Sequence, residues 1–228
     1  MHPTSFAASS TWPAVPVLLA ALLAAAMAMF AVVDAARRAN VGRRSSNRRI
    51  WLIATIAVAI GHLGGVSLPG GERLHFLGAA WLTLLLGYPR AVLSMSVIVL
   101  ARLALNAESA GLWGLSLLAE AVLPAWGIWW IAERCRRWLP PKPFIFLIGC
   151  ALFGVAAING LQTVFAAGIQ SLGSEAPALR IGQYLPFGLL LGWGEALLEA
   201  MVTTILVVYL PGVVACFDEE FYLRRRGP

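Results

Sequence analysis

The chain has 228 residues, of which 60% are hydrophobic and only 12% are charged. Soluble domains carry about 25% charged residues, so the composition excludes a soluble globular protein and indicates one that lies in a lipid bilayer. The net charge is +6, but the basic residues cluster in short loops, a pattern typical of membrane topology and not of nucleic-acid binding. Cys135, Cys150 and Cys216 have no paired spacing and predict neither a disulfide framework nor a metal cluster.

The first predicted element is a membrane helix over residues 15–33, after a polar external lead-in over residues 1–13. Its length is close to the roughly 20 residues that cross a bilayer. No positive charge precedes it and arginines follow it, which is the reverse of a secretory signal peptide. We therefore expect the helix to start outside, and residue 1 to remain in the mature protein.

Six further apolar segments predict membrane helices in chain order. Their expected ranges are residues 50–66, 74–87, 91–105, 115–132, 143–169 and 184–210. Tyr88 to Arg90 is expected to be a tight cytoplasmic turn, and residues 106–114 and 174–183 are expected to be external loops. Basic residues crowd the loops on one side, above all residues 34–49, and mark that side as cytoplasmic.

These segments predict an all-α polytopic membrane bundle of about seven transmembrane helices. The N-terminus is expected outside and the C-terminus inside. Residues 1–228 form a single integral membrane domain in this prediction, with residues 211–228 as a cytoplasmic tail.

Polar side chains recur at membrane depth, where a charged group costs at least about 2.5–3.5 kcal/mol to insert. Two interpretations stay open. Arg102 pairs with Glu120, Glu195 or Glu199 and fixes the packing, or the polar residues line a cavity or proton path. The residues of this expected intramembrane network are Arg102, Asn106, Glu120, Asn159, Gln162, Glu195 and Glu199.

Three histidines are distinguished by their surroundings. His62 has no charged neighbour in sequence and lies beside glycines, so a packing role is expected for it. His75 follows a Pro-Gly-Gly turn at the start of an apolar helix, where it either caps the helix or presents a ring nitrogen to a water-accessible pocket. His2 adds an imidazole to the amine and amide of the chain start. With one more imidazole, these nitrogens would make a planar site suited to Ni(II) or Cu(II) more than to Zn(II).

The stretch that contains His75 resembles the CbiM/NikM family, the substrate-binding membrane subunits of energy-coupling-factor transporters for cobalt and nickel. The resemblance implies a seven-helix bundle with an outside N-terminus. It also implies Ni(II) or Co(II) bound through the Met1 amine, the His2 amide and imidazole, and His75. The similar stretches are residues 68–87, with Pro-Gly-Gly, His-Phe-Leu-Gly-Ala-Ala and Leu-Leu-Leu-Gly, and more loosely residues 110–112, 194–197 and 201–204.

The sequence also departs from the family pattern. Pro3 to Phe6 follow Met-His where an isoleucine and an acidic-Gly pair are usual, and Glu120 stands in a helix where the family has an asparagine motif. The tail over residues 217–223 is similar to that of a divergent proteobacterial branch.

The expected function is that of a metal-binding subunit of a cobalt or nickel importer in the inner membrane, with the metal as transported ligand and no permanently bound cofactor. The chain has no Walker A pattern, so partner ATPases would supply the energy through a coupling membrane subunit. The alternative is a non-transporting accessory subunit of a larger membrane complex, suggested by the mixed acidic, aromatic and basic tail. No nucleophile–base pair or metal-hydrolase spacing indicates an enzyme.

Overall fold

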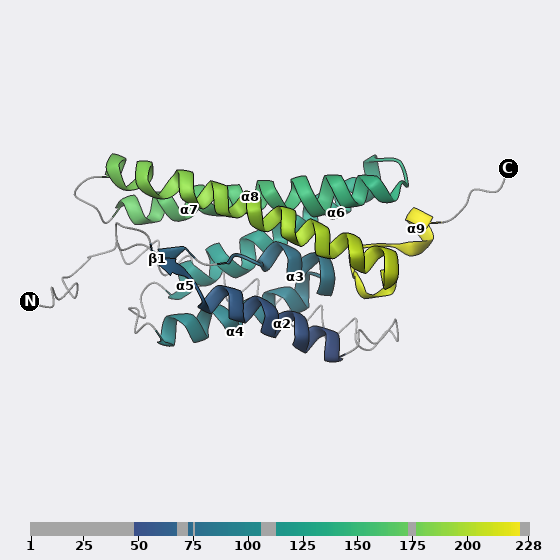
Figure 1. Cartoon of the computed structure of the whole chain (residues 1–228), viewed down its shortest axis with the longest axis horizontal. Helices are drawn as coiled ribbons and strands as arrows, with labels where there is room; N and C mark the ends of the chain where they lie inside the picture. Colours follow the sequence, from purple (N-terminus) through teal and green to yellow (C-terminus); the bar gives the residue numbers. More distant parts are fainter. Residues whose placement is uncertain (1–47, 68–72, 75, 106–112, 173–176, 224–228) are drawn as a thin grey trace, which may run out of the picture.

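The computed structural model of the protein describes residues 48–67, 73–74, 76–105, 113–172 and 177–223 (Figure 1). The predicted helix over residues 15–33 and the lead-in lie outside these residues. Over the described part, the prediction of a helical membrane bundle is confirmed, with one short antiparallel pair of strands added. The elements in order are α2 (Arg48–Leu63), β1 (Val66–Ser67), β2 (Arg73–Leu74), α3 (Ala79–Leu86), α4 (Tyr88–Leu105), α5 (Trp113–Leu117), η2 (Leu118–Val122), α6 (Leu123–Trp138), η3 (Ile145–Gly154), α7 (Val155–Leu172), α8 (Pro177–Tyr209), η4 (Pro211–Val213) and α9 (Glu219–Leu223).

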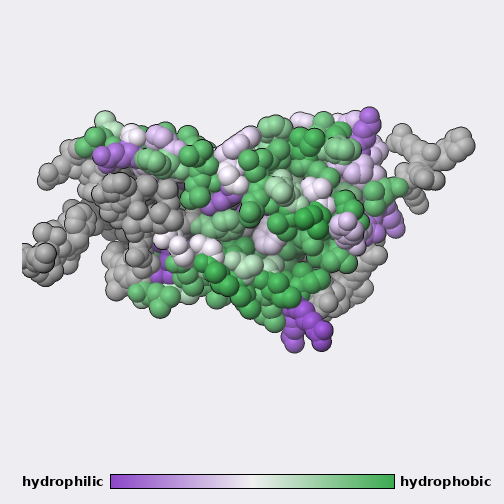
Figure 2. Space-filling model, in the orientation of Figure 1, coloured by the Kyte–Doolittle hydropathy of each residue, from purple (hydrophilic) through white to green (hydrophobic). Residues whose placement is uncertain are grey.

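Four helical stretches of the described residues are long and apolar enough to cross a membrane. Their outer faces carry large apolar side chains, such as Leu190 and Met201 on α8, that only lipid or another membrane protein would cover. Figure 2 shows a broad hydrophobic surface over the middle of the bundle, with hydrophilic residues mainly toward its two ends. The four stretches are Tyr88–Leu105, Gly114–Trp138, Ile145–Gly168 and Ile181–Tyr209.

Helix α3 lies at the centre of the bundle, because it is apolar on every side. All of its residues except Trp81 are buried. It is shorter than the predicted span over residues 74–87. Its eight residues rise only about 12 Å, well short of the roughly 30 Å hydrocarbon core. The predicted extent of this helix, residues 74–87, is therefore wrong, and the helix alone is too short to cross the membrane.

Two glycines set the ends of α3. Gly78 has a φ of 63° in the left-handed helical conformation, and Gly87 combines a φ of 82° with a ψ of 159°. Both positive φ values interrupt a right-handed helix. The chain turns at Gly87 alone, and Tyr88 already begins α4, with Pro89 in its first turn where a missing N–H costs nothing. The predicted turn over Tyr88 to Arg90 is thus a helix start.

Replacing Gly78 by alanine is expected to lower the free energy of unfolding by about 1–3 kcal/mol. A Cβ at this position would lie 2.5 Å from Cγ1 of Val58, and the positive φ adds backbone strain. Gly194→Ala is the control, because a Cβ there meets no atom within 4 Å and replaces glycine in a helix. Thermal unfolding in detergent measures both. Equal stability of the two variants would contradict the expectation.

Three other predicted boundaries also move. The helix predicted to end at residue 132 continues to Trp138, where two prolines follow it. Helix α8 begins at Pro177, so residues 177–183 are helical and not an external loop. Helix α2 ends at Leu63, and Val66 begins the strand pair in which it faces Leu74.

Helices α7 and α8 pack closely through small residues. A Cβ on Gly192 would lie 3.1 Å from that of Asn159, and one on Gly188 would collide with the Thr163 side chain. Asn159 Nδ2 donates to the Gly192 carbonyl at 3.2 Å, and Thr163 Oγ1 lies 3.4 Å from the Gly188 carbonyl. The two polar side chains therefore serve this helix contact.

The end of the chain packs on the bundle instead of forming a free tail. The Ala215 and Cys216 amides donate to the carbonyls of Leu85 and Leu84 at the end of α3. Phe217 and Tyr222 are buried, with their rings near that of Phe146. The described part of residues 211–228 is thus folded against the membrane domain.

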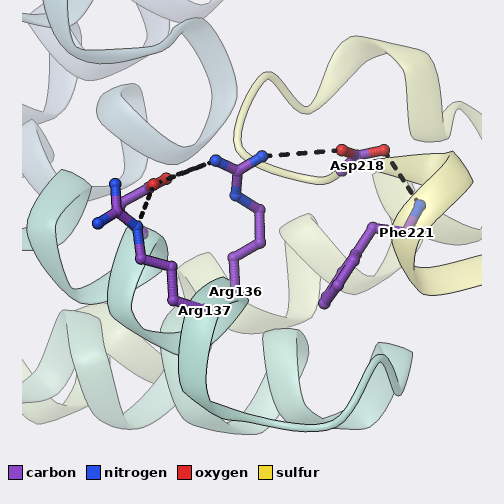
Figure 3. A network of polar contacts seen from close by, with 5 residues as sticks. Arg136, Arg137, Asp218 and Phe221 are labelled. Carbon is purple, nitrogen blue, oxygen red and sulfur yellow. Dashed lines mark hydrogen bonds and ion pairs between the residues drawn. The ribbon is translucent and has the colours of Figure 1, made fainter.

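A polar network holds α9 to the end of α6 (Figure 3). Arg136 lies between two carboxylates: its Nη2 is 2.9 Å from Oε2 of Glu133, and its Nη1 is 4.0 Å from Oδ2 of Asp218. Arg137 Nε donates to the other Glu133 oxygen at 2.8 Å. Asp218 Oδ1 accepts a bond from the Phe221 amide at 3.1 Å, which caps the start of α9.

Candidate functional site

The residues predicted as metal ligands, Met1, His2 and His75, lie outside the described residues, as does Asn106. The chain is described on both sides of His75, by the strand pair before it and by Phe76 and the residues that follow. The other predicted polar residues are buried or half-buried among the helices. They are Arg102, Glu120, Asn159, Gln162, Glu195 and Glu199.

The backbone that follows His75 is held by two side chains from distant helices. His62 of α2 has its Nδ1 2.7 Å from the carbonyl oxygen of Phe76. Because a carbonyl only accepts, Nδ1 is the donor. The Leu77 amide donates to Oε2 of Glu195, on α8, at 3.0 Å. Both His62 and Glu195 are buried, while Phe76 and Leu77 are half-buried.

Glu120 connects three elements at the same level of the bundle. Nη2 of Arg102 lies 2.8 Å and 3.0 Å from its two carboxylate oxygens. Nε2 of His62 lies 3.4 Å from Oε2 of Glu120. Of the three partners considered for Arg102, the structure places Glu120 opposite it.

His62 is the residue that sequence reasoning missed. Its glycine-rich neighbourhood suggested packing alone, but the fold places it between the Glu120 carboxylate and the Phe76 carbonyl. The sequence did hold one indication of this contact. His62 lies toward the outer end of its predicted helix, and Glu120 is expected at a similar depth in the membrane. A buried ionisable group at membrane depth needs a partner, so each of these two residues could have been predicted as the partner of the other.

The buried side of α8 carries further polar groups. Glu199 is one turn after Glu195 and only 2% exposed, and among the described residues neither of its oxygens has a hydrogen-bond partner. Thr203, a further turn along, is 1% exposed. On α7, both amide atoms of Gln162 likewise lack a partner in the described part of the chain. An ionised carboxylate in such a place is costly, so these groups indicate a polar interior and not a lipid-facing surface.

The described residues do not by themselves complete a metal site. Within residues 48–223 as described, no three His, Cys, Asp or Glu side chains gather where they could hold a metal ion. What the described geometry supplies is a pair of contacts from α2 and α8 to the peptide between Phe76 and Leu77, with Glu120 of η2 and Arg102 of α4 next to His62.

Long apolar helices around a buried polar interior define a multi-pass membrane protein. The chain belongs to the CbiM family: the family model described as the cobalt uptake substrate-specific transmembrane region matches residues 13–213. It is accordingly a transport component and not an enzyme. No curated protein and no solved structure matches the chain.

Proposed function

We propose that the chain is the metal-binding membrane subunit of an energy-coupling-factor-type importer for a divalent transition metal, cobalt or nickel. The observation that carries the proposal is the pair of hydrogen bonds to the backbone after His75, from His62 to the Phe76 carbonyl and from the Leu77 amide to Glu195, which we call the clamp. His62 and Glu195 fix the peptide that follows His75, and a metal ligand needs a defined position. The family match to a cobalt uptake region supports the same function.

The proposed ligands are the Met1 amine, the His2 amide and imidazole, and the His75 imidazole. Nitrogen donors of this kind suit late first-row metals such as nickel, and the imidazoles bind in their neutral form. The metal is cargo, so it binds outside and leaves inward. No permanently bound cofactor belongs to the proposal.

We place the chain in the inner membrane with the strand pair outside and α9 inside. Figure 1 shows β1 and α9 at opposite ends of the bundle. The α9 end carries the basic cluster of Arg134, Arg136 and Arg137, and basic residues favour the cytoplasmic side. The proposed partners, a coupling membrane subunit and ATPase subunits, would act from that side.

The alternative, an accessory subunit of another complex, was suggested by the tail as a docking segment. The structure of the described tail weakens this argument for a docking segment, because Phe217 and Tyr222 are buried against Phe146 of the same chain. These rings are therefore unavailable to a partner without unfolding of the tail.

Purification of the tagged chain from native membranes in mild detergent, followed by mass spectrometry, tests the proposal. We expect a second membrane protein and ATPase chains with Walker A motifs to accompany it. A tag on an unrelated membrane protein of similar abundance is the control. Stable association with a different membrane assembly, and with no ATPase, would contradict the proposal and favour the accessory function.

A further inference from the structure

The two anchors after His75 act on the same peptide group. The Phe76 carbonyl, bound by His62, and the Leu77 amide, bound by Glu195, belong to a single peptide plane. In a trans peptide these groups point in opposite directions, and no cis peptide occurs in the described residues. Helix α2 therefore holds this plane from one side and helix α8 from the other.

We propose that Glu195 is a positioning residue that sets the location of His75 for metal binding. The inference rests on the proposed function and adds to it a residue that lies 118 positions away in sequence from the amide it holds. Glu195 does not contact the metal in this proposal. It acts by fixing the peptide plane that lies one residue after the histidine.

The local backbone explains why the loop depends on this contact. Leu77 lies just before α3, and Gly78 is in the left-handed conformation, so the Leu77 amide has no place in the helical ladder. A buried backbone donor without a partner is costly, and a carboxylate is a stronger acceptor than a neutral group. Glu195, which is 5% exposed, supplies this acceptor from a helix of 33 residues.

Glu199 offers a matched control. It lies one turn further along the same buried face of α8, and the structure gives it no hydrogen bond to the loop. Glu195→Leu and Glu199→Leu therefore each remove one buried carboxyl group from α8, but only the first removes the clamp. Glu195→Gln keeps an oxygen acceptor at the same reach without the charge.

The test measures hydrogen–deuterium exchange of peptides that span residues 76–79, and Co(II) affinity by visible absorption, on the full chain in detergent. For Glu195→Leu we expect exchange at Leu77 to accelerate about tenfold or more in the metal-free protein. We expect Co(II) affinity to fall about 10–100-fold, the range for residues that orient a ligand. Glu195→Gln should restore most of both, and Glu199→Leu should change neither.

Unchanged exchange at Leu77 in Glu195→Leu, or equal effects in Glu199→Leu, would overturn the proposal. If Glu195→Leu does not fold, Glu195→Asp replaces it, since it keeps the buried carboxyl but is one methylene too short for the amide. Exchange at Leu77 must then still accelerate. A wild-type chain that binds no Co(II) would overturn the proposed function and the role of Glu195 in it. The exchange measurement would still decide whether Glu195 holds the loop.

Discussion

Replacing His75 by alanine is expected to weaken Co(II) or Ni(II) binding by more than about 100-fold. Residues that only orient a ligand contribute about 10–100-fold in affinity, so loss of a ligand should cost more. Affinity of the wild-type chain should also fall as the pH drops below about 6.5, because a protonated imidazole does not bind a metal. Titration of the purified protein with each metal, followed by visible absorption, measures both effects.

Cys135→Ala is the control for this variant. It removes a soft side chain that could ligate a metal, but from the last turn of α6, beside Arg136 and Arg137, and it is no part of the proposed site. Its affinity should equal that of the wild type. If His75→Ala binds Co(II) as tightly as Cys135→Ala does, His75 is not a ligand.

Replacing Glu120 by leucine is expected to destabilise the protein by about 3–5 kcal/mol, the cost of leaving one member of a buried ion pair without its partner. The side chains of Arg102 and Glu120 are only 15% and 18% exposed, and Arg102 meets both carboxylate oxygens. The double variant Arg102→Met/Glu120→Leu should cost less than the two single changes together, since it removes both charges of the pair and leaves neither facing an uncharged side chain. A double-mutant cycle of thermal unfolding in detergent measures this coupling.

Glu133→Gln is the matched control for the ion pair. Its partners Arg136 and Arg137 have side chains 46% and 66% exposed, and exposed pairs contribute only about 0–1 kcal/mol. A Glu120→Leu variant as stable as Glu133→Gln would show that the inner pair does not hold the bundle together. Additive single effects would show that the two residues act independently.

The sequence predicts the helical class of the bundle, since that depends only on hydrophobic length and loop charge. It does not predict the short central α3, because the apolar stretch covers most of residues 74–87 while the left-handed backbone at Gly78 delays the start of the helix to Ala79. Helix ends were also misplaced at Trp138 and Pro177, because helices continue beyond their apolar stretch into polar sequence.

Candidate site residues were predictable one by one but not as a set. The sequence singled out Glu120 and Glu195 as costly at membrane depth. It could not show that Glu195 reaches the Leu77 amide or that His62 meets Glu120, because these contacts join residues that are distant in the chain. Periodicity places residues on a face of one helix, and only the packing of α2, η2 and α8 decides which faces meet.

The most direct test of the central claim is a Co(II) and Ni(II) titration of the purified chain with a free native N-terminus, beside the same chain extended by a Gly-Ser dipeptide before Met1. A C-terminal Gly-Ser extension is the control. We expect one site per chain with the absorption of a nitrogen-rich ligand field, lost in the N-terminally extended chain and kept in the control. No binding by the native chain, or binding indifferent to the N-terminal extension, would contradict the proposed metal site.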